Sequence, residues 1–270
     1  MRSLTMKYPV MALCVCMLFL PGCENTDIQK VADAGRDAVK ALTLSDSDVQ
    51  EIASQSTRSS DKKHTLASPE DNYAKRLQHL VGQDRQDGTQ KYDYGVYLSP
   101  EVNAFAMANG TIRLYSGLMD MLNDGEVRFV IGHEMGHVAK NHIREKIRLA
   151  YAASAVRKGI ASQNNTAGNV AGSLFGDLAE SLVNAQFSQV EEKEADDYGM
   201  VFIKRKMFDP RDAVSALKKL SALSKGHSFL SSHPDPEARA ERLQAQLEGR
   251  ALSIDDKKQS ILGQLKKWLP

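Results

Sequence analysis

The sequence predicts an α+β fold that is mostly α-helical and has one small sheet. Helix start signals recur along the chain: Glu126 follows Asn123 at the spacing of a capping box, and Asp-Pro pairs stand at 209–210 and 235–236. The strand signals are fewer and gather between residues 91 and 115. A chain of 270 residues is long enough to bury one good-sized core around these elements.

The strand signals predict one strand followed by a hairpin. Tyr side chains alternate with small or polar residues over 91–98, as they do on a half-buried strand. Residues 103–107 and 111–115 lie on either side of Asn109-Gly110, a pair that favours tight hairpin turns.

The helix signals predict at least six helices. Ser68-Pro69-Glu70 is typical of a helix start and predicts a helix that ends near residue 81. The capping box at Asn123 predicts a long helix through Val138. Beyond a Gly-, Asn- and Ser-rich stretch at 159–173, helical patterns follow at 174–186 and 188–206, and the Asp-Pro pairs start helices that end near 223 and 247.

The composition is that of an ordinary globular protein, with 42% hydrophobic and 26% charged residues. Its 35 Lys and Arg against 34 Asp and Glu leave a net charge of +1, so no basic surface for nucleic acid is predicted. Aromatic residues make up only 6% of the chain, which also argues against a platform for stacking bases. We therefore expect no nucleic-acid partner.

The amino-terminal residues resemble a bacterial lipoprotein signal peptide. Two basic residues precede an apolar run at 10–20, which is long enough for a signal-peptide core and too short to span a bilayer. The run ends in Leu20-Pro21-Gly22-Cys23, which is similar to the lipobox in which cleavage precedes an acylated cysteine. A plain secretory signal or an uncleaved anchor is the alternative.

A lipidated Cys23 predicts a membrane attachment through the lipid anchor. Glu24 follows it in place of the Asp that resembles an inner-membrane retention signal, which favours an outer-membrane lipoprotein facing the periplasm of a Gram-negative bacterium. The predicted organisation is a signal peptide at 1–22, a tether with short helices at 23–67, a folded domain at 68–250 and an amphipathic extension at 251–270. The extension either packs on its own domain or contacts a membrane or partner.

The centre of the sequence is His133-Glu134-Met135-Gly136-His137. Two His four residues apart lie about 40° apart around a helix, so both imidazoles can bind one Zn²⁺. Glu134 stands beside that face, where its carboxylate can take a proton from water that the metal acidifies. The pattern predicts a Zn²⁺ site with Glu134 as general base, against the alternative of two surface histidines on an ordinary helix.

A third zinc ligand must come from elsewhere in the chain. The long HExxHxxGxxH signature would place a His where Ile143 stands. A carboxylate is therefore needed, and the acid-rich helical stretch 191–198 offers candidates. Glu192 and Asp196 share one helix face, which suits a ligand followed by an acid that hydrogen-bonds a ligand imidazole. Glu194 with Asp197 is the competing pair, and a solvated acidic face is the alternative without metal.

Two further histidines need an interpretation. His142 lies five residues past His137, about 140° further round a continuous helix, so we expect it to point away from the site. His233, before Pro234, can donate a hydrogen bond to the oxyanion of a reaction intermediate or can occupy the fourth zinc position and block it. A third possibility is that His233 only begins a loop.

These residues resemble the HtpX and CAAX-prenyl-protease family of gluzincin zinc metallopeptidases, and more closely its periplasmic lipoprotein branch. The resemblance spans about residues 70–247. It rests on the HExxH motif at 133–137, the E-x-E-A-D run at 192–196, Asn103-Ala-Phe-Ala with Gly110-Thr-Ile, and Ser232-His233-Pro234 with Arg239.

The resemblance implies a zincin-like metallopeptidase core at 68–250 with the small sheet beside the HExxH helix. It implies one Zn²⁺ per chain, with His133, His137 and Glu192 as ligands, Glu134 as base and Asp196 as the orienting acid. It further implies that the strand at 103–107 is an edge to which a peptide adds as an extra strand. The residues expected to bind substrate in this way are Asn103, Ala104 and Phe105.

The function that the resemblance implies is a zinc-dependent endopeptidase of the cell envelope. Its expected partners are polypeptide substrates, namely unfolded or misassembled periplasmic and outer-membrane proteins, and the envelope assembly machinery. The alternative is a lipoprotein chaperone or assembly factor whose zinc is structural or plugged by His233.

Overall fold

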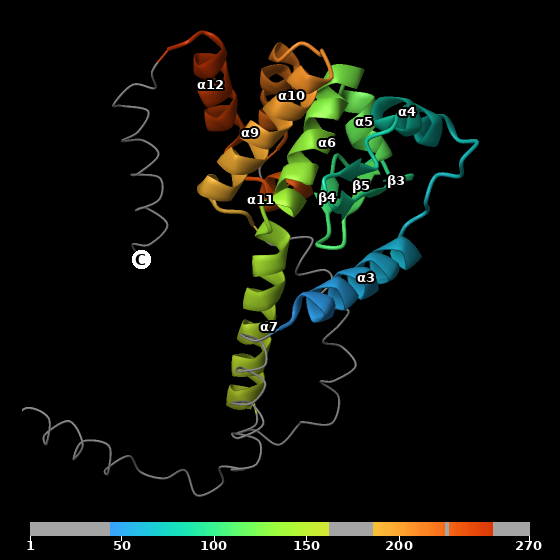
Figure 1. Cartoon of the computed structure of the whole chain (residues 1–270), viewed down its shortest axis with the longest axis vertical. Helices are drawn as coiled ribbons and strands as arrows, with labels where there is room; N and C mark the ends of the chain where they lie inside the picture. Colours follow the sequence, from blue (N-terminus) through green and yellow to red (C-terminus); the bar gives the residue numbers. More distant parts are fainter. Residues whose placement is uncertain (1–43, 162–185, 225–226, 251–270) are drawn as a thin grey trace, which may run out of the picture.

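Helix α6 (Asp124–Ala139) lies at the centre of the fold, between the sheet and the carboxyl-terminal helices (Figure 1). The computed structural model describes residues 44–161, 186–224 and 227–250. Nearly every α6 side chain is buried, as expected of a helix covered on all sides. Its predicted capping box is confirmed: the side chain of Asn123 accepts a hydrogen bond from the Glu126 N–H, and the Glu126 carboxylate accepts one from the Asn123 N–H.

The sheet has three strands in the order β3 (Asp93–Tyr97), β5 (Thr111–Tyr115) and β4 (Ala104–Ala106). Strand β5 pairs with β3 in parallel and with β4 antiparallel, so the predicted hairpin around Asn109-Gly110 is confirmed. Gly110 has a φ of +86°, and a Cβ there would lie 2.0 Å from the Lys91 carbonyl oxygen, so the turn requires glycine. Strands β1 (Gln86–Asp87) and β2 (Gln90–Lys91) form a separate small hairpin.

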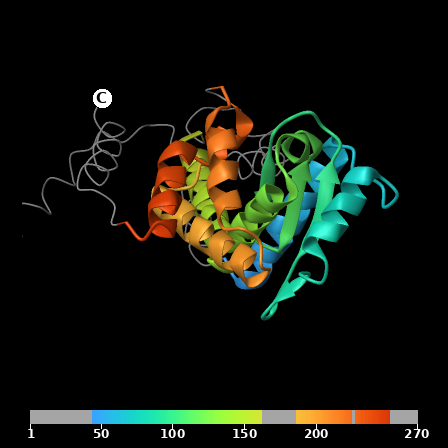
Figure 2. The ribbon, with the colours of Figure 1, turned by 90° about the horizontal axis from the view of Figure 1, so that it is seen from above.

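The remaining helices surround this centre. Figure 2 shows α10 and α12 in orange and red at one end of the molecule and α4 in cyan at the other. Helix α9 packs along α6, and α7 continues from the end of α6. Their bounds are α4 (Asn72–Val81), α5 (Ser116–Met121), α7 (His142–Ala161), α9 (Gln189–Arg205), α10 (Arg211–Ser221), α11 (Ser228–Ser232) and α12 (Pro236–Leu247).

Helices α6 and α9 approach each other closely because each has a glycine at the surface where the two helices meet. A Cβ on Gly136 would lie 2.9 Å from the Ala195 Cα, and one on Gly199 would lie 3.2 Å from the His133 backbone nitrogen. Either distance is tighter than ordinary packing allows, so a larger residue would push the helices apart. This contact sets the distance between the histidines of α6 and the acids of α9.

Helix α3 (Asp46–Lys63) lies in the segment that we expected to be a tether. A helix is present, but it packs on the domain: Val49 and Ala53 are fully buried in the common core. Asp61 also accepts two hydrogen bonds, of 3.0 and 3.1 Å, from the Arg113 guanidinium on β5. The packed unit therefore includes residues 44–67, whereas the predicted signal peptide, the tether residues 23–43 and the extension 251–270 lie outside the described residues.

Most other expected elements are found with small differences at their ends. The helix predicted from Ser68-Pro69 instead begins at Asn72, because Asp71 accepts the capping hydrogen bond from the Tyr73 N–H. The helices predicted from the two Asp-Pro pairs and at 188–206 are confirmed as α10, α12 and α9. The helical pattern at 174–186 lies almost wholly outside the described residues. Among the described helices, none combines the length and the apolar character that crossing a bilayer demands.

Candidate metal centre

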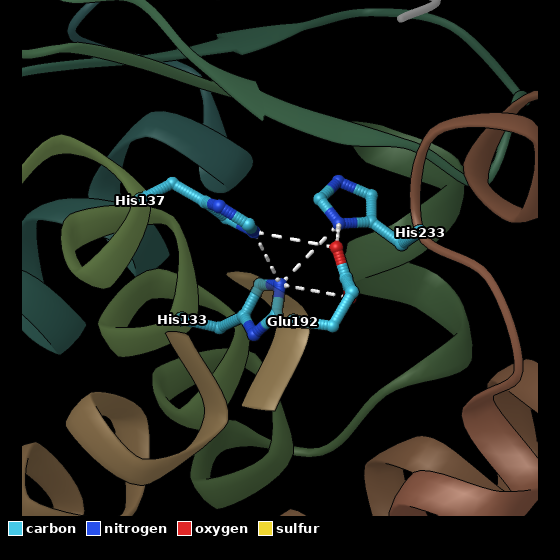
Figure 3. A group of neighbouring side chains, drawn as sticks. All are labelled: His133, His137, Glu192 and His233. Carbon is cyan, nitrogen blue, oxygen red and sulfur yellow. Dashed lines mark hydrogen bonds and ion pairs between the residues drawn. The ribbon is translucent and has the colours of Figure 1, made fainter. Parts of the chain in front are cut away.

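Helix α6 presents His133 and His137 toward the same point, one helical turn apart. Their Nε2 atoms lie 3.1 Å from each other, and both side chains are buried. Figure 3 shows the two rings converging with Glu192 and His233. The i, i+4 prediction for this pair is therefore confirmed geometrically.

Glu192 reaches the same point from the first turn of α9. Its carboxylate oxygens lie 3.5 Å from His137 Nε2 and 3.6 Å from His133 Nε2 (Figure 3). A capping box of Ser188 with Glu191 starts α9 at the position that places the next residue, Glu192, against α6. Of the two acids that the sequence left in competition, the structure brings Glu192 to the histidines.

His233 completes the cluster from the short connection between α11 and α12. Its Nδ1 lies 3.1 Å from Glu192 Oε1 and 3.3 Å from His133 Nε2 (Figure 3). Its Nε2 faces Glu134, at 3.5 Å from Oε1. One donor atom from each of His133, His137, Glu192 and His233 lies within 4.8 Å of the other three.

The chemistry of these donors fits a zinc ion. Imidazole nitrogens and a carboxylate oxygen are the ligands that Zn²⁺ takes in proteins. Burial lowers the pKa of His137 well below its ordinary value, so its ring is neutral and has a lone pair to give. Burial raises the pKa of Glu192, but the charges of Arg239 and His233 outweigh it and hold the pKa well below its usual range. Glu134 Oε1 is buried and accepts no hydrogen bond, so it keeps a lone pair that can take a proton.

Asp196 lies beside His133, where the resemblance places an orienting acid. Its Oδ1 accepts a hydrogen bond of 3.0 Å from His133 Nδ1, so the Nε2 of that ring is the atom left for metal. Burial raises the pKa of Asp196, but Arg239 and His133 outweigh this and the pKa lies well below its ordinary value. The carboxylate is therefore ionised and a strong acceptor.

Arg239, on α12, binds the carboxylates of Glu192 and Asp196 on α9. Its Nε and Nη2 donate to the two oxygens of Asp196, at 2.9 and 2.6 Å, and its Nη1 contacts Glu192 Oε2. All three side chains are buried. The sequence resemblance included Arg239 only as part of a motif, and its spacing of six residues from His233 was the signal that marked it.

The expectation that His142 points away from the site is wrong. Helix α6 ends at Ala139, and a new helix begins at His142, so the angle calculated for a continuous helix does not apply. The ring of His142 is buried, and its Nδ1 lies 3.0 Å from His137 Nδ1. Glu194, the rival ligand candidate, lies 2.9 Å from His142 Nε2 instead of at the metal centre.

Phe187 and Lys146 cover the centre, and no sequence pattern indicated them. The Phe187 ring stacks on the His137 ring, with the two ring centroids 3.6 Å apart. The Lys146 Nζ lies 2.9 Å from the centroid of the Phe187 ring. The Phe187 N–H also donates to the Ser232 carbonyl, next to His233. Burial lowers the pKa of Lys146 to about 7.

The residues expected to bind substrate lie at the edge of the sheet. Asn103 directly precedes β4, and Ala104 and Phe105 are in it. Strand β4 is the outer strand beside β5, and it packs against α6. The prediction of an edge strand next to the HExxH helix is therefore confirmed, and the binding of a peptide to it stays a prediction.

The helical fold with a small sheet, and the buried donor set beside Glu134, define a zinc metallopeptidase of the zincin type. The chain belongs to Peptidase family M48, whose sequence profile matches residues 68–247. It is 40% identical over 227 residues to the metalloprotease LoiP of Escherichia coli, which covers 83% of this chain and 90% of LoiP. It is 37% identical over 241 residues to the metalloprotease YcaL of the same organism, covering 87% of this chain and 94% of YcaL.

A third relative is more distant. The β-barrel assembly-enhancing protease of Yersinia pestis is 30% identical over 153 residues, which cover 52% of this chain and 31% of that protein. Family membership confirms that the chain is a zinc-dependent metalloendopeptidase with polypeptide substrates. The comparisons give no support to the alternative of a chaperone with a structural zinc.

We expect Arg239→Ala to destabilise the protein strongly. The substitution leaves the Glu192 and Asp196 carboxylates buried without their shared cation, and breaking a buried ion pair costs about 3–5 kcal/mol. Urea unfolding of the zinc-free protein measures the loss. Arg250→Ala is the matched control, because Arg250 is exposed and its ion-pair partner within the described residues is the exposed Glu248. It should change stability by less than about 0.5 kcal/mol. Equal losses in the two variants would contradict this role of Arg239.

Proposed function

We propose that this protein is a lipid-anchored endopeptidase of the cell envelope that cleaves unfolded or misassembled proteins. The observation that carries the peptidase assignment is Glu134, a buried carboxylate free of hydrogen bonds at Oε1 beside three zinc-type ligands. The lipobox-like run ending at Cys23 supports an outer-membrane lipoprotein that faces the periplasm. The assignment of substrates is supported by one relative, which is named for enhancing β-barrel assembly.

The residues of the site have separate tasks in peptide hydrolysis. His133, His137 and Glu192 would hold the zinc ion, which would act as a Lewis acid on the scissile carbonyl and would lower the pKa of bound water. Glu134 takes a proton from the attacking water and passes it to the amine that leaves. Asp196 and Arg239 keep His133 and Glu192 in place, since Asp196 bonds to the His133 Nδ1 and Arg239 contacts the Glu192 Oε2.

The edge of β4 is proposed to bind the substrate backbone. Strand β4 pairs with β5 on one side only among the described strands, so its other side can accept an extended peptide. Main-chain hydrogen bonds of this kind do not depend on side chains, which suits a protease that cleaves unfolded segments of varied sequence. Asn103, Ala104 and Phe105 would contribute mainly their backbone groups.

His233 is proposed to plug the site in this conformation. Its Nδ1 lies among the zinc ligands, and its Nε2 lies 3.5 Å from the general base Glu134. It thus takes up both positions that a substrate and its attacking water need. Displacement of His233 would free them, and the same side chain could then donate to the oxyanion.

We expect Glu134→Gln to retain zinc and to lose turnover. Gln keeps the shape of the side chain but cannot accept a proton, and loss of a general base costs about 10²–10⁴-fold in rate. Casein cleavage with and without a chelator measures activity, and elemental analysis of the purified protein measures zinc. A zinc-free Glu134→Gln protein would instead make Glu134 a ligand.

We expect His233→Ala to raise casein cleavage while zinc remains bound, because the substitution opens the fourth zinc position. If His233 served only as an oxyanion donor, the same change would lower turnover by about 10²–10³-fold. His227→Ala is the matched control, since His227 is the residue before α11, at the opposite end of that short helix from His233, and lies outside the donor cluster. Activity equal to that of the control would leave His233 as a loop residue and contradict the proposal.

We expect Cys23→Ser to abolish incorporation of labelled palmitate, since the serine hydroxyl does not replace the acylated thiol of the lipobox. The variant should then be found in the soluble periplasmic fraction or remain uncleaved. Cell fractionation with fatty-acid labelling distinguishes these outcomes, and Cys16→Ser, within the expected signal peptide, is the control. A cleaved Cys23→Ser protein that stays in the membrane would show that another segment holds it there.

A further inference from the structure

The two histidines of the HExxH motif are supported in different ways. His133 Nδ1 contacts the carboxylate of Asp196 directly, at 3.0 Å. His137 Nδ1 instead contacts a second imidazole, that of His142, which in turn contacts Glu194. We propose that His142 and Glu194 are positioning residues that hold His137 in its zinc-binding orientation and so determine how tightly the protein retains zinc. The proposal rests on the zinc site described above.

The positions of the protons in this row of hydrogen-bonded side chains follow from the atoms that face one another. His137 Nε2 points at His133 and Glu192, so a zinc ion would take its lone pair and the ring proton must lie on Nδ1. That N–H donates to His142 Nδ1 at 3.0 Å. The neutral ring of His142 then carries its own proton on Nε2 and donates it to Glu194 Oε2 at 2.9 Å. The row of hydrogen bonds ends at the Glu194 carboxylate, which can only accept.

A single backbone conformation brings His142 to this place. Asn141 has a φ of +62°, in the left-handed region that Asn adopts more readily than most residues. Its N–H donates to the Val138 carbonyl, which closes the end of α6. The helix is therefore interrupted at this residue, and His142, the first residue of α7, lies beside His137.

The position of Glu194 on α9 explains why a second ring is needed. Asp196 lies one turn after Glu192 on the face against α6, and it is completely buried. Glu194 lies between them on a different side of the helix, and its side chain is 47% exposed. Its carboxylate reaches His137 only through the His142 ring. Because water screens the exposed carboxylate, Glu194 should contribute less to zinc retention than His142 does.

The test is a measurement of zinc affinity on the full mature chain, by competition with a chromogenic chelator. We expect His142→Ala to weaken zinc binding by about 10–100-fold, the usual effect of removing a group that orients a metal ligand. Glu194→Ala should weaken it by less than about tenfold, since its carboxylate is partly in water. His142→Gln should recover much of the loss, because its amide can both accept from His137 and donate to Glu194.

Two controls separate positioning from a loss of structure. Glu241→Ala removes an exposed acid on α12 and should leave zinc affinity unchanged. Thermal unfolding of the zinc-free proteins should give the same midpoint for Glu194→Ala and wild type, while their zinc affinities differ. Unchanged affinity in both His142→Ala and Glu194→Ala would overturn the proposal. A loss in His142→Ala that His142→Gln does not recover, with wild-type affinity in Glu194→Ala, would also overturn it.

The measurement is independent of the proposed peptidase function. Zinc affinity is read without substrate, so a protein that binds zinc but cleaves no casein would still test His142 and Glu194. Conversely, full casein cleavage in the wild type with unchanged zinc affinity in the variants would overturn only the positioning role.

Discussion

The whole site depends on one buried ion cluster, in which Arg239 lies between Glu192 and Asp196. Two carboxylates with no exposed surface would be very costly without a cation, and the guanidinium supplies several donors in fixed directions. The negative charges of Asp196 and Glu192 raise the pKa of Arg239 and outweigh the effect of burial, so the guanidinium stays protonated. Because Arg239 belongs to α12, this interaction connects α12 to Glu192 and Asp196 on α9.

The close approach of α6 and α9 allows that cluster to form. Gly132, Gly136 and Gly199 have no side chain of their own to hold the helices apart, so Glu192 can reach two histidines that belong to α6. At its start, α6 is also held to α10, where the buried Glu126 of the capping box accepts hydrogen bonds from Lys219 and Ser215. The helix that carries the HExxH motif is thus fixed at both ends, and its ligands have little freedom to move. Fixed ligands reduce the cost of ordering a metal site.

Sequence reasoning found the parts of the site that follow from helical periodicity. The pairs His133 with His137 and Glu192 with Asp196 each repeat at four residues, and that spacing predicted the first pair and favoured the second over Glu194 with Asp197. His142 could not be placed in this way, because Asn141 interrupts the helix with a positive φ that no pattern indicated. The packing of α3 was also missed, since its apolar residues are few and its buried positions include Ser56, Thr57 and Ser60. Such a helix has a weak amphipathic pattern, and a weak pattern of this kind predicts a tether and not a packed helix.

The difference between fixed and less constrained ligands bears on how the proposed protease would be controlled. His133, His137 and Glu134 belong to the buried central helix α6, and Glu192 on α9 is held by the Arg239 guanidinium. His233 lies between the five-residue α11 and the start of α12, where Asp235 has a φ of +54°. Moving its side chain breaks contacts with Glu192, Glu134 and His133 but does not require any helix to unfold. A substrate that competes for the fourth zinc position would therefore displace His233 before any other ligand, so the same cluster can be stable at rest and accessible when a peptide binds.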